Sequence, residues 1–340
     1  MKKKLALALA LTMMVGLFAG CGSKEPAGGD GDTADAKTYN VGVSIYQFDD
    51  NFMTLYRNEI EAYFKTLETD DVKYNVTIVD GKNDMATQTN QIDTFITQGM
   101  DVIICNLVQT SSAEIIIDKV VDAGIPLILI NREPLGETDE SYEGIIDNPT
   151  VCYVGADARQ SGTYQGEIVA ALDNQGDMNG DGVVKYVMIE GDPENPDAQY
   201  RTQFSIKALE DAGISVECLV DQVGNWATDK GQEIAANALT QHGNPIDVIF
   251  CNTDGMALGA AAAIEAAGRT VGEDLLLRGV DALDDCVDMI KAGTMTGTVL
   301  NDHIGQSHKA VDVAIKALKG EPIDNYYWVD YVKVDADYVK

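Results

Sequence analysis

Polar and aromatic side chains gather at the points where apolar, strand-like runs of this sequence end. They are Asp50, Phe52, Asn106, Asn195, Asp197, Arg201, Trp226, Asp281 and Asn301, with Asn252, Thr253 and Asp254 at one further strand end. Carboxylate and amide oxygens accept protons from hydroxyl groups, arginine and amide N–H groups donate, and an aromatic ring covers an apolar C–H face. Together these groups have the chemistry of a site for a neutral polyol.

Each of these residues also has a simpler explanation. Asp50, Asn195 and Asp254 stand where helices are predicted to begin, and Asp and Asn are favoured helix N-caps. Trp226 could belong to the core, and Arg201 to an exposed helix face. In parallel α/β sheets, however, ligands bind beyond the carboxyl ends of the strands. The joint placement at such ends therefore favours a binding site.

The elements that would position these residues alternate regularly between short β-rich runs and helical stretches. The apolar runs are 41–46, 76–80, 101–106, 126–131, 184–191, 214–220, 246–252, 275–281, 296–301 and 327–334. Helices are predicted over 51–67, 84–98, 111–122, 197–211, 226–241, 254–267, 283–292 and 303–318. This alternation is typical of parallel sheets built from βα units.

The run DVIICN at 101–106 recurs as DVIFCN at 247–252. A similar strand at a similar stage of each half indicates two lobes of like topology. With 340 residues and roughly 100–200 residues per domain, two lobes also fit the length. The predicted fold class is α/β, with two doubly wound parallel-sheet lobes.

Composition excludes several classes of protein. With 45% hydrophobic and 23% charged residues the chain is of globular type, and 24 Lys+Arg against 55 Asp+Glu give a net charge of −31. A surface this acidic repels phosphate backbones, so we expect no nucleic-acid partner. Three histidines leave little room for a histidine-built centre.

The N-terminus has the pattern of an export signal. Three lysines precede an apolar run from Leu5 to Leu17, which is shorter than the about 20 residues that span a bilayer. The segment 17–21, LFAGC, resembles a bacterial lipobox, which implies a signal peptide over 1–20 and lipidation of Cys21. Plain secretion is the alternative. Residues 21–38 contain few apolar groups and are predicted to be a flexible tether.

Five further cysteines remain, an odd number that argues against a full set of disulfides. Cys105, Cys152 and Cys251 lie in strand-like runs, where free cysteine packs as a small apolar residue. We predict buried free thiols rather than disulfides.

The segment Asp177-Met-Asn179-Gly-Asp181-Gly182 has the D-x-N-x-D-G start of an EF-hand-like loop. Oxygens at alternate positions and a glycine at the turn suit Ca²⁺. The alternative is an Asp/Asn/Gly turn that binds no metal.

At the strand ends the sequence resembles the galactose/glucose-binding proteins, which are type I periplasmic-type receptors of sugar ABC transporters. The matching stretches are 46–52, 106–108, 131–134, 191–198 with Arg201, 279–283 and 297–302. The resemblance covers residues 39 to 335. It implies a pyranose between Phe52 and Trp226, hydrogen-bonded by Asp50, Asn106, Asp197, Arg201, Asp281 and Asn301.

The resemblance also implies how the chain is divided. It predicts an N-lobe of residues 39–130 plus 302–328 and a C-lobe of residues 131–301 plus 329–340. Three crossovers, near Asn131, Asn301 and Trp328, would join the lobes, which close on the sugar. The implied partners are a monosaccharide, an ABC transporter permease, a chemoreceptor and, through the lipid anchor, the outer face of the cell membrane. The protein is expected to be a monomer.

The sequence departs from the family pattern at several positions. Asn195 stands where the family has His, and Thr253 where it has Asn; these two complete the predicted ligand set and leave the exact sugar open. In the family, the calcium loop is completed by a backbone oxygen, here Val183, and by two side-chain oxygens. This chain has Lys185 and Asp247 at those two places, and lysine has no acceptor.

Three other functional classes are alternatives to a sugar receptor of this kind. The sequence has no G-x-S-x-G elbow, P-loop or G-x-G-x-x-G after a strand, which argues against an enzyme. A glycosidase remains conceivable because Asp50, Asp197 and Asp281 are expected to converge. A sugar-sensing repressor would need a basic DNA-binding segment where this chain has an export signal. A receptor of the same class for a pentose or a signalling furanose is the main alternative.

Overall fold

The computed structural model describes residues 36–136 and 142–340. The predicted signal peptide, the lipidation of Cys21 and most of the tether therefore lie outside the described residues. The tether was predicted to extend to residue 38, but the first strand already begins at Lys37, so the tether ends earlier.

Within the described ranges, the strands form two six-stranded sheets of the same topology. Their orders are β11-β5-β4-β3-β1-β2 and β12-β10-β9-β8-β6-β7. All neighbouring pairs are parallel except β10 and β12. The repeated runs at 101–106 and 247–252 become β3 and β8, which hold the same place in their sheets. The α/β fold class with two parallel-sheet lobes is confirmed.

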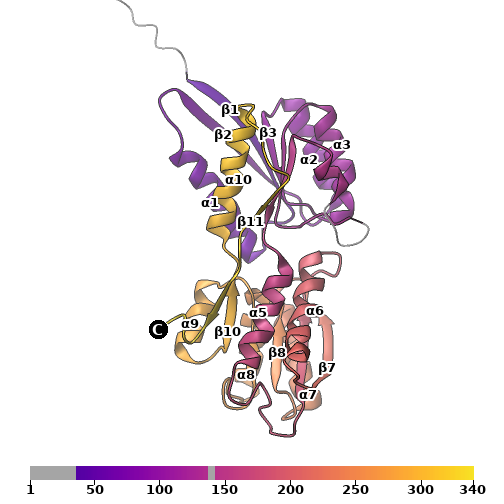
Figure 1. Ribbon diagram of the computed structural model, residues 1–340, viewed down its shortest axis with the longest axis vertical. Coiled ribbons are helices and arrows are strands. Elements are labelled where there is room, and N and C mark those ends of the chain that lie inside the picture. Colours follow the sequence, from indigo (N-terminus) through magenta and orange to yellow (C-terminus); the bar gives the residue numbers. More distant parts are fainter. Residues whose placement is uncertain (1–35, 137–141) are drawn as a thin grey trace, which may run out of the picture. The chain divides into compact units, whose positions relative to one another are not determined.

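The sheet that contains β1 defines the N-lobe (Figure 1). Its strands are β1 (Lys37–Ile45), β2 (Val72–Asp80), β3 (Val102–Cys105), β4 (Leu127–Ile130), β5 (Val151–Gly155) and β11 (Tyr326–Trp328). Its helices are α1 (Asn51–Thr66), α2 (Met85–Gln98), α3 (Ala113–Asp122) after a 3-10 turn (Thr110–Ser112), α4 (Glu143–Ile146) and α10 (His303–Leu318).

The N-lobe strands are apolar throughout because helices cover both faces of the sheet. Ile104 and Ile128 pack toward α1 and α10, whereas Ile103 and Leu129 pack toward α2 and α3. Figure 1 shows α1 beside α10 on one side of this sheet and α2 beside α3 on the other. The alternation of neighbouring residues between two cores is the pattern of a doubly wound sheet.

The second sheet defines the C-lobe. Its strands are β6 (Val184–Glu190), β7 (Val216–Val223), β8 (Val248–Cys251), β9 (Leu276–Arg278), β10 (Gly297–Leu300) and β12 (Val332–Asp335). Its helices are α5 (Ala158–Ala170), α6 (Pro196–Asp211), α7 (Thr228–His242), α8 (Asp254–Ala266) and α9 (Asp284–Ala292). Met188 and Phe250 pack toward α5 and α6, and Ile189 and Ile249 toward α7 and α8.

The chain passes between the sheets three times, but the first passage is not where the sequence predicted it. The passages lie at 156–157, 301–302 and 329–331. The last two agree with the expected crossovers near Asn301 and Trp328. The first was expected near Asn131, and this was wrong because β5 pairs with β4 and β11 in the N-lobe sheet. Residues 131–136 and 142–155 therefore belong to the N-lobe.

The helix α5 was missed because its buried face carries almost no large apolar side chain. Gly162 and Gly166 lie on that face, where a Cβ at either residue would collide with the backbone of α6. These glycines let α5 and α6 pack closely. This contact matters for function because α6 carries Asp197 and Arg201.

The five described cysteines are free thiols, but the prediction that they are buried is wrong for Cys218. Cys105, Cys152, Cys251 and Cys286 are buried, and Cys218 is exposed. Burial raises the pKa of Cys105 to about 12, so this thiol stays protonated and acts as a packing group.

Candidate functional site

The predicted site residues gather around one pocket that both lobes line. The space among the lining residues measures about 310 Å³, including the part open to solvent. The lining residues are Tyr46, Asp50, Phe52, Met53, Asn131, Arg132, Asn195, Asp197, Arg201, Trp226, Thr253, Asp281 and Asn301. Every predicted ligand residue except Asn106 is among them.

On the N-lobe side, the start of α1 provides Asp50 and Phe52. Asp50 is the N-cap of α1, and its Oδ1 accepts a hydrogen bond from the Met53 amide at 2.6 Å. Its Oδ2 accepts one from the Tyr46 hydroxyl at 2.7 Å. Capping and pocket lining are therefore not alternatives, because the same carboxylate does both.

On the C-lobe side, the start of α6 provides Asn195, Asp197 and Arg201. Asn195 caps the helix through its side-chain oxygen, which accepts from the Asp197 amide at 3.0 Å. One helical turn separates Asp197 from Arg201, and Arg201 Nη2 lies 3.1 Å from Asp197 Oδ2. Burial raises the pKa of Asp197, and the Arg201 guanidinium counteracts part of that shift. Both side chains are buried, so this is not an exposed helix face.

Arg201 is held by three separate parts of the chain. Besides Asp197, it donates to the Asn252 carbonyl at 3.0 Å and to the Tyr331 hydroxyl at 3.1 Å. Tyr331 lies in the third passage between the lobes. The guanidinium is therefore fixed in orientation toward the pocket.

Trp226 contacts the apolar cores of both lobes. Its backbone has a φ of 67°, in the left-handed region. A Cβ on Gly191 would lie 2.0 Å from the indole ring, so only glycine at the end of β6 leaves room for this side chain. Its Nε1 is buried without a partner among the described residues. Trp226 is a pocket wall as well as a packing residue.

Asp281 follows β9 at a φ of 123°. Asn301 Nδ2 donates to its Oδ1 at 3.3 Å, and Gln306 donates to Asn301 Oδ1 at 2.6 Å, which orients the amide. Burial raises the pKa of Asp281 well above its ordinary value, with Arg201 acting in the opposite direction. A buried carboxylate with so few donors has acceptor capacity to offer a ligand.

Asp254 lies behind this part of the pocket and does not line it. It is fully buried, and it accepts from the Thr298 hydroxyl at 2.7 Å and the Leu283 amide at 2.9 Å. Burial raises its pKa to about 6, and the Thr298 and Leu283 hydrogen bonds oppose that shift. Asp254 thus links the segment after β9, which carries Asp281, to β10. The N-cap of α8 is the neighbouring Thr253, which lines the pocket.

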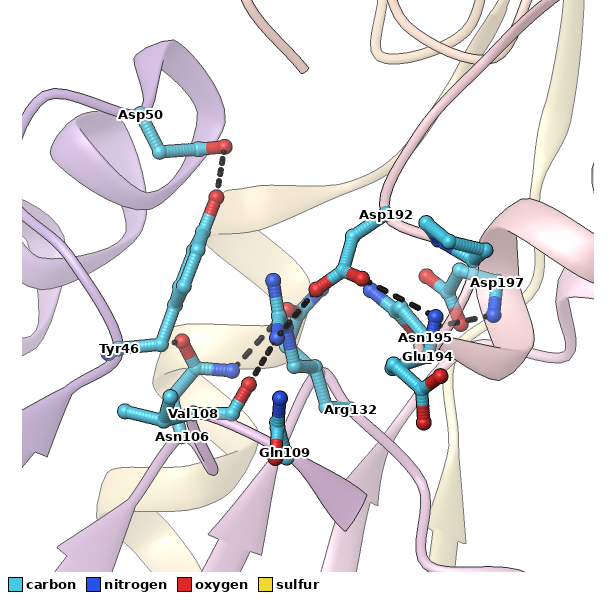
Figure 2. A network of polar contacts seen from close by, with 12 residues as sticks. Tyr46, Asp50, Asn106, Val108, Gln109, Arg132, Asp192, Glu194, Asn195 and Asp197 are labelled. Carbon is cyan, nitrogen blue, oxygen red and sulfur yellow. Dashed lines mark hydrogen bonds and ion pairs between the residues drawn. The ribbon is translucent and has the colours of Figure 1, made fainter. Parts of the chain in front are cut away.

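Figure 2 shows a polar network that joins the two lobes through Arg132, which the sequence analysis missed. Arg132 is 1% exposed, its guanidinium lies 3.8 Å from the centre of the Tyr46 ring, and Nη1 donates to the Val108 carbonyl. Nη1 also lies 3.4 Å from Asp192 Oδ2 of the C-lobe.

A signal for Arg132 was present in the sequence. Asn131 and Arg132 directly follow the apolar run that becomes β4, so they stand at a strand end like the other site residues. Asn131 has a φ of 63°, and its carbonyl accepts from the Tyr153 hydroxyl at 2.7 Å. This turn brings Arg132 over Tyr46.

Asn106 lies behind the pocket wall. It is fully buried; its Oδ1 accepts from the Tyr46 amide at 3.3 Å, and its Nδ2 donates to Asn131 Oδ1 at 3.1 Å. Asn252 has the equivalent role in the C-lobe, where its Oδ1 accepts from the Gly191 amide at 2.9 Å. Both asparagines tie a neighbouring strand end in place, and direct ligand contact by Asn106 remains a prediction.

Three pocket-lining residues carry a buried N–H donor without a partner among the described residues. They are Arg132 Nε, Arg201 Nε and Trp226 Nε1. An unpaired buried donor costs about 1–3 kcal/mol. The arrangement therefore offers donors and carboxylate acceptors to a ligand that is rich in both kinds of partner.

The predicted calcium loop lies in the C-lobe, just before β6. Asp177, Asn179, Asp181 and Asp247 come together there, as the resemblance implied, but their oxygens already have donors. Asp177 accepts from the amides of Gly180, Asp181 and Gly182, and Val183 donates its amide to Asp181 Oδ1. Among the described residues, no group of three His, Cys, Asp or Glu is arranged to hold a metal ion. This donor set fits Ca²⁺ poorly.

No helix of the described part combines the length and the apolar character needed to cross a membrane.

Comparisons with known proteins agree with this geometry. A family model described as a periplasmic binding protein domain matches residues 41–322. The D-galactose/methyl-galactoside binding periplasmic protein MglB of Haemophilus influenzae is 34% identical over 322 residues, covering 91% of this chain and 93% of that protein. A putative rhizopine-binding protein of Rhizobium meliloti is 34% identical over 298 residues, covering 87% of this chain and 90% of that protein.

A solved structure shares the architecture. An ABC transporter solute binding protein from Bacillus halodurans, with bound myo-inositol, superposes with a TM-score of 0.76 at 28% identity. The match covers 91% of this chain and 97% of that one.

Proposed function

The chain belongs to the periplasmic binding protein family of sugar-binding, non-enzymatic ABC transporter receptors, and on that premise we propose that it captures a pyranose, galactose or glucose. Proteins of this family work outside the cytoplasm. Family membership also removes the glycosidase alternative, although Asp50, Asp197 and Asp281 do line one pocket.

The observation that carries the proposal is that several polar groups of the pocket lack hydrogen-bond partners within the protein. Arg132, Arg201 and Trp226 each hold a buried donor without a partner, and Asp281 has acceptor capacity to spare. A hydroxyl group both donates and accepts, so a sugar satisfies both kinds of group at once. Without such a ligand these buried polar atoms stay unpaired, and this costs free energy.

Charge supports a neutral ligand. Asp192 lies beside Arg132, and Asp197 pairs with Arg201, so the two guanidinium groups already have anionic neighbours. Asp281 adds a further carboxyl group, whose pKa burial raises and the Arg201 guanidinium lowers. A carboxylated or phosphorylated sugar would meet net repulsion in this pocket.

The pocket captures a sugar because the residues that would contact it come from both lobes. Asp50 and Phe52 come from the N-lobe, whereas Asp197, Trp226 and Asp281 come from the C-lobe. A sugar that contacts both sets favours the state in which they are close together. The state that encloses the sugar would then deliver it to an ABC permease.

The identity of the sugar depends on Asn195 and Thr253. The relative from H. influenzae is named for galactose and methyl-galactoside. In this chain the side-chain oxygens of Asn195 and Thr253 both accept from helix amides, so each residue has mainly its donor to offer. The alternative is a receptor of the same class for a pentose or a furanose, because Asn195 and Thr253 depart from the family pattern.

A thermal-shift panel tests the proposal and separates the ligands. We expect galactose or glucose to raise the melting temperature more than ribose or myo-inositol, and galacturonate to give no shift because of its carboxylate. A larger shift with ribose would support the alternative ligand. Stabilisation by galacturonate alone would contradict the neutral-sugar proposal.

We also propose that lipidated Cys21 anchors the protein and that the segment after it tethers the lobes. The lipobox-like segment 17–21 and the small polar residues that follow support this. A Cys21→Ser variant should leave the membrane fraction and appear in the soluble extracytoplasmic fraction. If this variant remained with the membrane, the anchor would be elsewhere.

Two further predictions are that a chemoreceptor is a partner of this protein and that the protein is a monomer. Light scattering of the purified protein with and without sugar tests the second. A mass near 36.6 kDa, less the cleaved signal peptide, is expected for a monomer.

A further inference from the structure

We propose that the ammonium group of Lys185 takes the place of the calcium ion in the loop 177–183, so that this chain orders the loop without a metal. The inference concerns the C-lobe scaffold and does not depend on which sugar binds. It rests on the contacts of Lys185, Asp181, Asp247 and Asp177.

Lys185 lies at the ninth position of the EF-hand-like loop, where a calcium loop supplies an oxygen. Here its Nζ forms an ion pair with Asp181 Oδ2. The other oxygen of Asp181 accepts from the Val183 amide at 3.1 Å. Asp181, at the fifth position of the loop, would ligate calcium, but the Lys185 ammonium already neutralises its carboxylate.

This pair is more enclosed than the other i,i+4 lysine pair of the C-lobe. The Lys185 side chain is 18% exposed, whereas Lys207, which pairs with Asp211 on α6, is 50% exposed.

Asp247, which is far from the loop in the sequence, stands where the family has the last carboxylate ligand of the calcium ion. Its Oδ1 accepts from the amides of Met178 and Asn179 at 2.9 and 3.1 Å, and its Oδ2 accepts from the Lys185 amide at 2.8 Å. The Asn179 side-chain amide lies 3.2 Å from the same carboxylate. Asp247 thus fastens the loop to the start of β8 through N–H donors rather than through a metal.

Asp177 completes the arrangement at the first loop position. Its Oδ1 accepts from the Gly180 amide at 2.7 Å and its Oδ2 from the Gly182 amide at 2.8 Å. Calcium takes six to eight oxygens, and in this loop an ammonium group that pairs with Asp181 stands where one of those oxygens is expected. The conformation of a calcium loop is kept while the ion is replaced.

Thermal unfolding of the purified protein in EDTA and in millimolar CaCl₂ tests this inference. The wild-type melting temperature should be the same in both solutions. The Lys185→Met variant keeps the aliphatic stem and removes the ammonium, so we expect its melting temperature to fall by about 2 °C.

The Lys185→Gln variant gives a sharper result, because it removes the cation and adds an oxygen at the ninth position. It should melt below the wild type in EDTA and recover in CaCl₂. The matched control is Lys207→Met, which deletes the exposed i,i+4 pair on α6 and should melt within about 0.5 °C of the wild type.

Two outcomes would overturn the inference. One is a wild-type melting temperature that falls in EDTA or rises in CaCl₂, because the loop would then use the metal. The other is a Lys185→Met variant that melts with the Lys207→Met control, because Lys185 would then be an ordinary surface lysine.

Discussion

The pocket and the loop 177–183 are both rich in side-chain oxygens, yet they differ in what is left unpaired. In the pocket, Arg132, Arg201 and Trp226 retain buried donors without partners. In the loop, the carboxylates of Asp177 and Asp247 accept from several N–H groups of the chain.

The difference teaches that spacing and residue type alone do not identify a binding site. Both regions match a ligand-binding pattern at the level of sequence. Of these two regions, only the pocket has buried polar side-chain atoms without a partner among the described residues, and such atoms are uncommon in folded proteins because they are costly. The four predictions that follow test this contrast.

The largest expected effect is at Asp281, because its carboxylate has few donors within the protein. Asp281→Ala should weaken sugar binding about 100-fold, since one or two charge-assisted hydrogen bonds at about 1.5–3 kcal/mol each are lost. Calorimetric titration measures this. The exposed Asp285, four residues along the chain, provides the control Asp285→Ala. A change below twofold for Asp281→Ala would remove this residue from the site.

The loop should respond in the opposite way, with loss of stability and no loss of affinity. Asp247→Ala leaves the Met178, Asn179 and Lys185 amides without their acceptor, so the free energy of unfolding should fall by about 2 kcal/mol. Denaturant unfolding measures the stability, and calorimetry the sugar affinity. If sugar affinity fell with stability, the separation between loop and pocket would not hold.

Trp226 tests the aromatic wall of the pocket. Trp226→Ala should weaken sugar binding about tenfold, because a stacking face worth about 1.5 kcal/mol is removed. The other tryptophan of the chain, Trp328, is 46% exposed and outside the pocket, so Trp328→Ala is a matched control. Equal affinities for the two variants would show that Trp226 is only a core residue.

The pH dependence of stability should have opposite signs for Asp254, behind the pocket, and Asp181, in the loop. Asp254 has a pKa of about 6 in the folded state, above its ordinary value, so the folded state takes up its proton first. Its contribution to the free energy of unfolding should rise by about 1 kcal/mol as the pH falls from about 7 to 5. The pKa of Asp181 is lowered, so its contribution is present above the ordinary pKa and is lost as the pH falls through the folded value.

Comparing the wild type with Asp254→Asn isolates the Asp254 contribution. The difference in unfolding free energy between the two should change over this pH range, because asparagine does not titrate. A difference that stayed constant would mean that Asp254 is already protonated, or fully ionised, throughout.

The sequence predicted the elements well where a pattern of apolar residues was strong. The helix expected over 303–318 is α10 with the same bounds, and the two repeated runs became equivalent strands. The prediction failed at 151–170, because β5 belongs to the N-lobe sheet and α5 buries small residues that give no apolar stripe. The position of the first crossover depends on strand pairing, which local pattern does not encode.

The site was predictable in part for a similar reason. Residues at strand ends are found from sequence once the strands are known, and nine of the predicted ligands line the pocket. Arg132 was missed although it stands at such an end, because its contact with Asp192 joins residues of two lobes. Only the packed structure shows whether an oxygen is free or already accepts a hydrogen bond, as the oxygens of the loop do.

The most direct test of the contrast between pocket and loop is a calorimetric titration with galactose and with glucose, in EDTA and again in calcium. The account predicts one-to-one binding of a hexose with the same affinity in both solutions, because the pocket binds the sugar and the loop needs no metal. Absence of binding by any neutral sugar, or loss of affinity in EDTA, would contradict it.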